Sequence, residues 1–157
     1  MGLIIPKGIT IRANKDPLKL ATEEDIPTVL KLAMSFGKET DYQDLISEEV
    51  TEALIRTLVT SDNNSTIVIL WKDVGVIAGA KVPFIYGPHT VATELFWWVQ
   101  PDHRKLGVGE QLLNAFEFWA KQVGCDLITM VGLDNKLDKY YRKKGYKLYE
   151  RAYMKKI

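Results

Sequence analysis

The chain has few of the residues that build metal centres and disulfides. Among its 157 residues are one cysteine, Cys125, and two histidines, His89 and His103, which form no ligand-spaced cluster. A single cysteine excludes an internal disulfide and fits a reducing cytosol. The scarcity of histidine and cysteine predicts no metal site. Cys125 has no identifiable histidine partner, so we expect a small apolar side chain entering a strand rather than a nucleophile.

Long apolar runs and a strong excess of one charge are also missing. No apolar run reaches the roughly 18 residues of a membrane-spanning helix, and residues 1–11 lack the pattern of a signal peptide. The net charge of +1 argues against bulk electrostatic binding to nucleic acid or membranes. We therefore expect one cytoplasmic domain of residues 1–157, with residues 1–16 as an optional N-terminal extension.

The apolar pattern alternates between strand and helix periods along the whole chain. Thr22 and Asp25 have the spacing of a capping box, and residues 37–46 are expected to form a loop. The expected helices cover residues 22–36, a stretch from Ser47, the residues after Gly109 and residues 135–144. The expected strands are residues 18–21, 66–71, 76–85, 90–99, 127–131, 146–149 and 152–156. The order β-α-α-β-β-β-α-β-α-β-β predicts a mixed sheet with helices on its faces, an α/β fold.

Residues 104–109 lie between an apolar strand and an amphipathic helix. Arg104 and Lys105 precede two glycines, Gly107 and Gly109, at this junction. The unpaired N–H groups and the dipole of a helix N-terminus favour an anion, and glycine lets a phosphate oxygen approach the backbone. The pattern Arg-x-x-Gly-x-Gly therefore indicates a phosphate-binding loop, and a structural glycine loop is the alternative.

Two other nucleotide-binding motifs fit this loop poorly. A P-loop would continue with Lys and Ser or Thr after the second glycine, whereas Glu110 and Gln111 follow here. A Rossmann fingerprint needs a third glycine, and position 112 is leucine.

Three segments, taken together, resemble the GNAT superfamily of acyl-CoA-dependent N-acetyltransferases. Residues 18–27 are similar to its first strand and helix. Residues 99–109 are similar to its Val-x-Pro-x-x-Arg/Gln-x-x-Gly-x-Gly, and residues 140–146 to its Phe-Tyr-x-x-x-Gly-Phe. The resemblance extends from Leu18 to Met154 and suggests the small single-domain members of bacteria and phages. It implies a GNAT-like fold and transfer of an acetyl group from acetyl-CoA to the amine of a small molecule or a protein.

The resemblance also assigns coenzyme A to two segments. The pyrophosphate would bind backbone amides of the loop, with Arg104 at its edge, through Lys105, Leu106, Gly107, Val108, Gly109 and Glu110. The pantetheine arm would pair with the backbone of Trp97, Trp98 and Val99 as an added strand would. The family often places an asparagine seven residues before its catalytic tyrosine. Here Asn135 lies six residues before Tyr141 and Asp134 takes the seventh place, so Asn135 is a shifted candidate.

Two residues are candidates for proton transfer. Tyr141, four residues before Gly145, matches the tyrosine that protonates the coenzyme A sulfur in many members, and a phenol with a pKa near 10 can donate at neutral pH. Glu94 is the only carboxylate in the strand 90–99, where several relatives keep a catalytic base. Strict alternation puts Glu94 on the face opposite Val99. A β-bulge would restore the face, and ordered water is the alternative base.

Basic residues gather at the C-terminal end of the chain. Residues 135–157 contain nine basic and two acidic side chains, a net charge of +7. This segment fits a solvated, charged sheet edge, attraction for coenzyme A phosphates, or contact with nucleic acid or an acidic partner. The alternative function is therefore a non-catalytic module that binds acyl-CoA or a macromolecule. A homodimer is left open, and we expect residues 36–46 and 86–90 to build the acceptor pocket.

Overall fold

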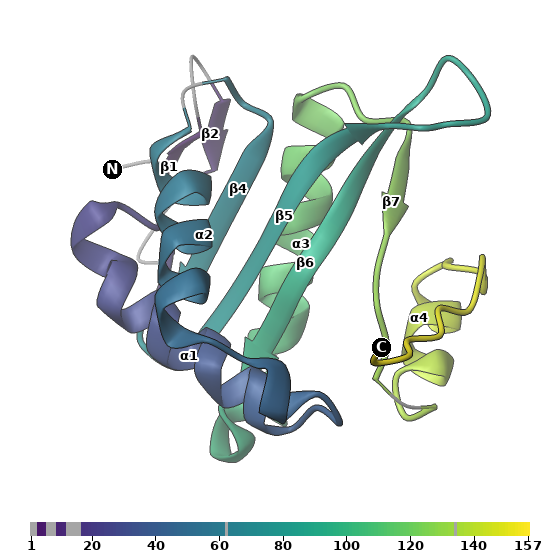
Figure 1. Ribbon diagram of the computed structural model, residues 1–157. Helices are drawn as coiled ribbons and strands as arrows, with labels where there is room; N and C mark the ends of the chain where they lie inside the picture. Colours follow the sequence, from purple (N-terminus) through teal and green to yellow (C-terminus); the bar gives the residue numbers. More distant parts are fainter. Residues whose placement is uncertain (1–2, 6–8, 12–16, 62, 134) are drawn as a thin grey trace.

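The computed structural model describes residues 3–5, 9–11, 17–61, 63–133 and 135–157, with a five-stranded sheet at its centre (Figure 1). Across the sheet the strands are β3 (Leu18–Leu20), β4 (Thr66–Trp71), β5 (Gly75–Pro83), β6 (Thr90–Val99) and β7 (Leu127–Thr129). β3 to β6 pair antiparallel and β7 pairs parallel to β6. This mixed sheet confirms the predicted fold class. β1 (Leu3–Ile5) and β2 (Ile9–Ile11) form a separate antiparallel pair.

Helices cover both faces of the sheet (Figure 1). α1 (Ile26–Lys38) and α2 (Glu48–Thr60) lie on one face, α3 (Val108–Gln122) lies on the other, and the short α4 (Asp138–Lys143) follows β7. The α3 layer includes Ile77, Ala92, Val99, Leu112, Phe116 and Trp119. The α1–α2 layer includes Val29, Leu32, Ile55, Val76, Ala78, Phe96 and Trp98. α1, α2 and α3 thus each bury one apolar face, which is the pattern that the spacing of three and four residues predicts, whereas α4 has no buried residue.

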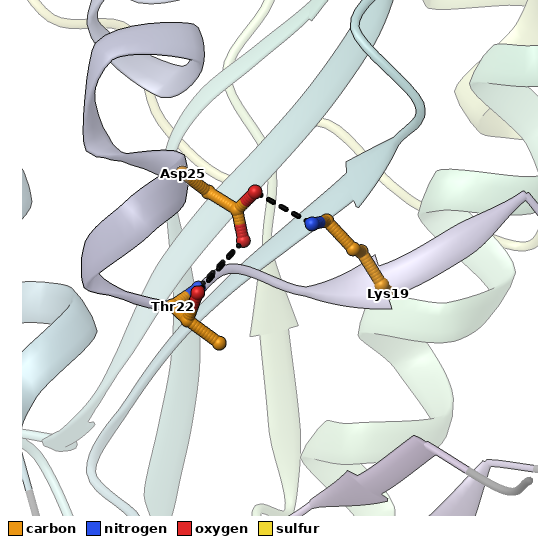
Figure 2. Close-up of polar contacts among 3 residues, drawn as sticks. All are labelled: Lys19, Thr22 and Asp25. Carbon is orange, nitrogen blue, oxygen red and sulfur yellow. Dashed lines mark hydrogen bonds and ion pairs between the residues drawn. The ribbon is translucent and has the colours of Figure 1, made fainter.

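The start of α1 is fixed by the expected capping contacts (Figure 2). The main-chain N–H of Thr22 donates to Asp25 Oδ2 at 2.9 Å, and Lys19 Nζ donates to Asp25 Oδ1 at 2.5 Å. Burial acts to raise the pKa of Asp25, but the bonds from Lys19 and Thr22 outweigh it and leave that pKa below its ordinary value. These contacts join β3 to the turn that begins α1 (η1, Glu23–Asp25).

A bulge in β6 changes which face its side chains occupy. Ala78 of β5 is opposite Phe96, and the next residue, Gly79, is opposite Glu94, so Leu95 has no partner in β5. A Cβ on Gly79 would meet the Phe116 ring of α3, which places the Gly79–Glu94 pair on the α3 face. Strict alternation, which put Glu94 with Phe96 and Trp98, is therefore wrong for this strand. The bulge brings Glu94 to the same face as Trp97 and Val99.

The two closing strands expected at residues 146–149 and 152–156 are not formed, and this prediction is wrong. Residues 146–157 have no strand, and Leu148, Tyr149 and Tyr153 are exposed. Alternation supplies a side-chain pattern, but a strand also needs main-chain partners. β7 ends at Thr129, and the N–H and C=O of Val131 beyond it bind side chains instead of a further strand.

Several boundaries also differ from the expectation. The second hairpin strand ends at Pro83 rather than at residue 85, and the last helix is shorter, Asp138–Lys143 rather than 135–144. The loop expected at residues 37–46 contains the end of α1 and a 3-10 turn, η2 (Gln43–Leu45). Within the residues described here, no helix combines the length and apolarity needed to cross a membrane.

Candidate active site

The pairing of β6 with β7 ends at Thr93, one residue before Glu94. β7 pairs with β6 only at Val91, Ala92 and Thr93, whereas β6 continues to Val99. Beyond this point the chain after β7 diverges from β6 (Figure 1). Apart from Leu95, the residues of β6 from Glu94 to Val99 therefore pair with β5 on one side, and none of them pairs with β7 on the other. The three residues predicted to line the pantetheine arm, Trp97, Trp98 and Val99, all lie in this part of β6.

Glu94 and Tyr141 meet at the main chain of Val131, beside this opening. The N–H of Val131 donates to Glu94 Oε2 at 3.0 Å, and the Tyr141 hydroxyl donates to the C=O of Val131 at 3.0 Å. Glu94 comes from β6, Tyr141 from α4 and Val131 from the segment after β7. The structure thus brings together both predicted proton-transfer residues, which are 47 positions apart in the sequence.

The surroundings of the two side chains shift both pKa values upward. Glu94 is only 5% exposed, and burial raises its pKa to about 7, although the bond from the Val131 N–H acts in the opposite direction. Burial, followed by the charges of Glu94 and Tyr140, raises the pKa of Tyr141 above its ordinary value. At neutral pH the pair therefore offers a carboxyl group near its titration point and a phenol that keeps its proton.

Tyr141 belongs to a cluster of aromatic rings. Its ring lies 6.3 Å from that of Trp97, 6.1 Å from Tyr140 and 5.6 Å from Tyr146, centroid to centroid. The neighbouring Tyr140 packs against the α3 core, and its buried hydroxyl has no hydrogen-bond partner within the described part of the chain. The two adjacent tyrosines therefore have different surroundings, with only the Tyr141 hydroxyl bonded to Val131.

The glycine loop opens α3 as expected. Gly107 is the N-cap of α3 with a φ of +81°, and a Cβ there would have no neighbour within 4 Å. Lys105, Leu106 and Gly107 are exposed, and Val108 is buried under the loop. The first N–H groups of α3 have no partner inside the helix. A Cβ on Gly109 would meet Trp97 Cζ2 at 3.3 Å, so this glycine admits close packing of the helix on β6.

Arg104, at the start of the loop, contacts the end of β6 and the residue after α1. Its Nε donates to the C=O of Val99 at 2.8 Å, and its guanidinium lies 4.4 Å from the centre of the Trp98 ring. The same guanidinium forms an ion pair with Glu39 at 3.4 Å, just beyond the end of α1. In this arrangement Arg104 ties the loop to β6 and α1.

The remaining predicted site residues surround the same region. Glu110 lies in the first turn of α3 and is 3.6 Å from Lys144 Nζ, just beyond α4. Asn135 is exposed before α4, and its C=O accepts the N–H of Asp138. Asp134, the residue that displaces the asparagine from its usual place, lies outside the described residues.

Sequence reasoning missed two participants, Val131 and Tyr146. Val131 acts through its main chain, so its side chain carries no signal. Tyr146 donates its hydroxyl to Glu117 Oε1 at 2.8 Å, across to α3. The only signal for Tyr146 is a tyrosine at the last position of the segment 140–146, where the resembling pattern has phenylalanine.

Comparison with known proteins identifies the family of the chain. The sequence model of the acetyltransferase (GNAT) family matches residues 28–146. The chain therefore belongs to the GNAT family of acetyltransferases, enzymes that use acetyl-CoA as the acetyl donor. No curated protein sequence is significantly similar to the chain.

Solved structures of acetyltransferases share the fold. A putative acetyl transferase from Pyrococcus furiosus is 24% identical with a TM-score of 0.68, covering 89% of this chain and 99% of its own. An acetyltransferase from Trypanosoma brucei is 20% identical with a TM-score of 0.68, and the shares covered are 89% and 98%. An aminoglycoside antibiotic 6'-N-acetyltransferase from Acinetobacter haemolyticus is 22% identical with a TM-score of 0.67 and the same coverage. At these identities the similarity establishes the fold.

Proposed function

We propose that the protein transfers an acetyl group from acetyl-CoA directly to an amine, with Glu94 as general base and Tyr141 as general acid. One observation carries the proposal: a buried carboxyl group and a phenol meet at Val131, where β6 and β7 part. The acceptor is an amine of a small molecule or of a protein.

Each residue has a defined part in the proton transfers. Glu94, with a pKa of about 7, accepts a proton from the attacking amine, because a base is most effective when its pKa is close to the working pH. As the C–N bond forms and the C–S bond of the thioester breaks, Tyr141 donates its proton to the departing sulfur. The raised pKa of Tyr141 keeps the phenol protonated until that step.

The loop before α3 supplies the donor site in this proposal. The exposed residues Lys105, Leu106 and Gly107 and the open space at Gly107 would admit a phosphate group at the start of α3. The backbone of Trp97, Trp98 and Val99 would pair with the pantetheine arm, because β7 does not cover this edge of β6. Arg104 would hold the loop in place through Val99 and Glu39.

A pair of tyrosine variants tests the proposal. Coenzyme A release is measured with acetyl-CoA and a panel of primary amines, and Tyr141→Phe is compared with Tyr140→Phe on each accepted amine. We expect Tyr141→Phe to lower kcat by about 10² to 10⁴-fold, the usual contribution of a general acid, with little change in acetyl-CoA affinity. Tyr140→Phe removes the same atom from the adjacent ring and should change kcat little. Equal effects of the two variants would contradict the assignment of Tyr141.

Binding of acetyl-CoA is measured separately, by calorimetry and by thermal melting. A ligand that binds only the folded state raises the melting temperature. If near-millimolar acetyl-CoA gives neither heat of binding nor a shift, the donor assignment fails.

A further inference from the structure

Tyr141 lies on a helix that is too short to hold its own shape. α4 contains six residues, and isolated helices shorter than about 12 residues are marginal in water. A general acid must nevertheless be held close to its working position. The contacts that α4 and the residues after it make with α3 therefore decide where the Tyr141 hydroxyl lies.

The turn after α4 connects Tyr141 to Tyr146. Gly145 has a φ of +91°, which reverses the chain, and the N–H of Tyr146 then donates to the C=O of Tyr141 at 2.9 Å. The two rings lie 5.6 Å apart at an interplanar angle of 59°. Tyr146 therefore contacts Tyr141 twice, once through the main chain and once through the rings.

Tyr146 is in turn fixed to α3. Its hydroxyl donates to Glu117 Oε1 at 2.8 Å in a half-buried position. Burial and this bond raise the pKa of Tyr146, so its hydroxyl stays a donor at neutral pH. Lys144 adds a second, more exposed contact by donating to Asn114 Oδ1 at 2.8 Å. Phenylalanine, which the resembling family pattern has at this place, could stack on Tyr141 but could not bond to Glu117.

We infer that Tyr146 and Glu117 are positioning residues for acetyl transfer, which hold the hydroxyl of Tyr141 in place through the hydrogen bond between α3 and the end of α4. The inference rests on the proposed role of Tyr141. The Tyr146 hydroxyl bonds to Glu117 rather than to the Tyr141 hydroxyl, so the effect of both residues reaches Tyr141 through its ring and main chain.

The inference predicts a specific kinetic signature. Misplacement of a catalytic group by about 1 Å can cost on the order of 10²-fold in rate. We therefore expect Tyr146→Phe to lower kcat by roughly 10-fold to 10²-fold. The KM for acetyl-CoA should stay close to wild type. Glu117→Leu should match Tyr146→Phe, whereas Glu117→Gln should restore a kcat near wild type, because the glutamine carbonyl still accepts the hydroxyl. Tyr149→Phe removes a hydroxyl from a residue that is 61% exposed and serves as the matched control.

A double-mutant cycle with Tyr141→Phe tests whether Tyr146 acts through the Tyr141 hydroxyl. If Tyr146 acts through the Tyr141 hydroxyl, Tyr146→Phe should lower kcat in the wild-type background and have no further effect in Tyr141→Phe. Thermal melting of every variant checks that the fold is retained. A wild-type kcat for Tyr146→Phe, or the same fold-loss in both backgrounds, would overturn the positioning role while leaving Tyr141 as the acid. A wild-type kcat for Tyr141→Phe would instead overturn the proposed acid, and the positioning role with it.

Discussion

Glu94 and Tyr141 bind the two main-chain groups of a single residue, Val131. The carboxylate accepts the N–H and the phenol donates to the C=O, each at 3.0 Å. A displacement of Val131 therefore moves the partners of both side chains together. This arrangement links β6, the segment after β7 and α4 at the place where the proposed chemistry occurs.

The first prediction concerns the pH dependence of the reaction. If Glu94 is the general base, kcat/KM should rise as the pH increases through about 7, because the carboxyl group loses its proton in that range. Glu94→Gln should lower kcat/KM by about 10² to 10⁴-fold and remove this rise. The measurement is a pH–rate profile of both proteins with one accepted amine. A wild-type profile in the variant would show that another base, such as ordered water, takes the proton.

The raised pKa of Glu94 should also make the stability of the protein depend on pH. Stability should fall as the pH rises, whereas kcat/KM should increase. Because the pKa of Glu94 is raised on folding, the native state holds its proton more tightly than the unfolded chain. The contribution of Glu94 to stability is therefore fully present below the unfolded pKa and is lost as the pH rises through about 7. We expect Glu94→Gln to raise the melting temperature more at pH about 8 than at pH about 5, since the buried negative charge is removed. An equal change at both pH values would contradict this linkage.

Gly107 and Gly124 offer a matched pair of substitutions at the two ends of α3. Both have positive φ, +81° and +76°, and a Cβ would have no neighbour within 4 Å at either position. Alanine should therefore cost roughly 1–2 kcal/mol of stability at each position, from backbone strain alone. Only Gly107→Ala should also weaken acetyl-CoA binding in calorimetry, because only Gly107 lies in the proposed donor site. Equal affinities in the two variants would show that the phosphate binds elsewhere.

The contacts of Asp25 predict a pH-dependent contribution to stability (Figure 2). The pKa of Asp25 is lowered on folding, so its contribution is present above the unfolded pKa and is lost as the pH falls through the folded value. Asp25→Ala should cost about 0.5–2 kcal/mol at neutral pH, the range for a lost helix cap. The difference from wild type, measured by denaturant unfolding, should shrink at acidic pH. Glu24→Ala, at the exposed neighbouring position, is the control and should have a small effect.

Features set by local sequence could be predicted, and those set by contacts between distant segments could not. The turn that begins at Thr22 and leads into α1, and the glycine loop at Gly107, depend on neighbouring residues. The bulge at Leu95 depends on how β6 pairs with β5: β6 itself contains no glycine or proline, and the glycine at the register shift, Gly79, lies in the partner strand. This is why the sequence left the face of Glu94 undecided.

The C-terminal end illustrates the same limit. The alternation of apolar and polar residues in 146–156 is typical of strands, yet these residues pair with no other strand. The contact between Tyr146 and Glu117 joins residues 29 positions apart and is equally invisible in the local pattern. The assignment of Arg104 to the edge of the phosphate site stays a prediction, since its guanidinium contacts Val99, Trp98 and Glu39.

The bulge in β6 also sets a condition on how the chain folds. A hairpin that closes from the turn at residues 84–89 pairs Lys81 with Ala92, Ala80 with Thr93 and Gly79 with Glu94 before it reaches Leu95. If pairing continued there without the extra residue, Leu95 would take the place of Phe96 opposite Ala78. Every later side chain of β6 would then turn to the wrong helix layer. The chain must therefore adopt the correct register beyond Leu95 in order to fold. Only this register buries Phe96 and Trp98 under α1 while Trp97 and Val99 face α3.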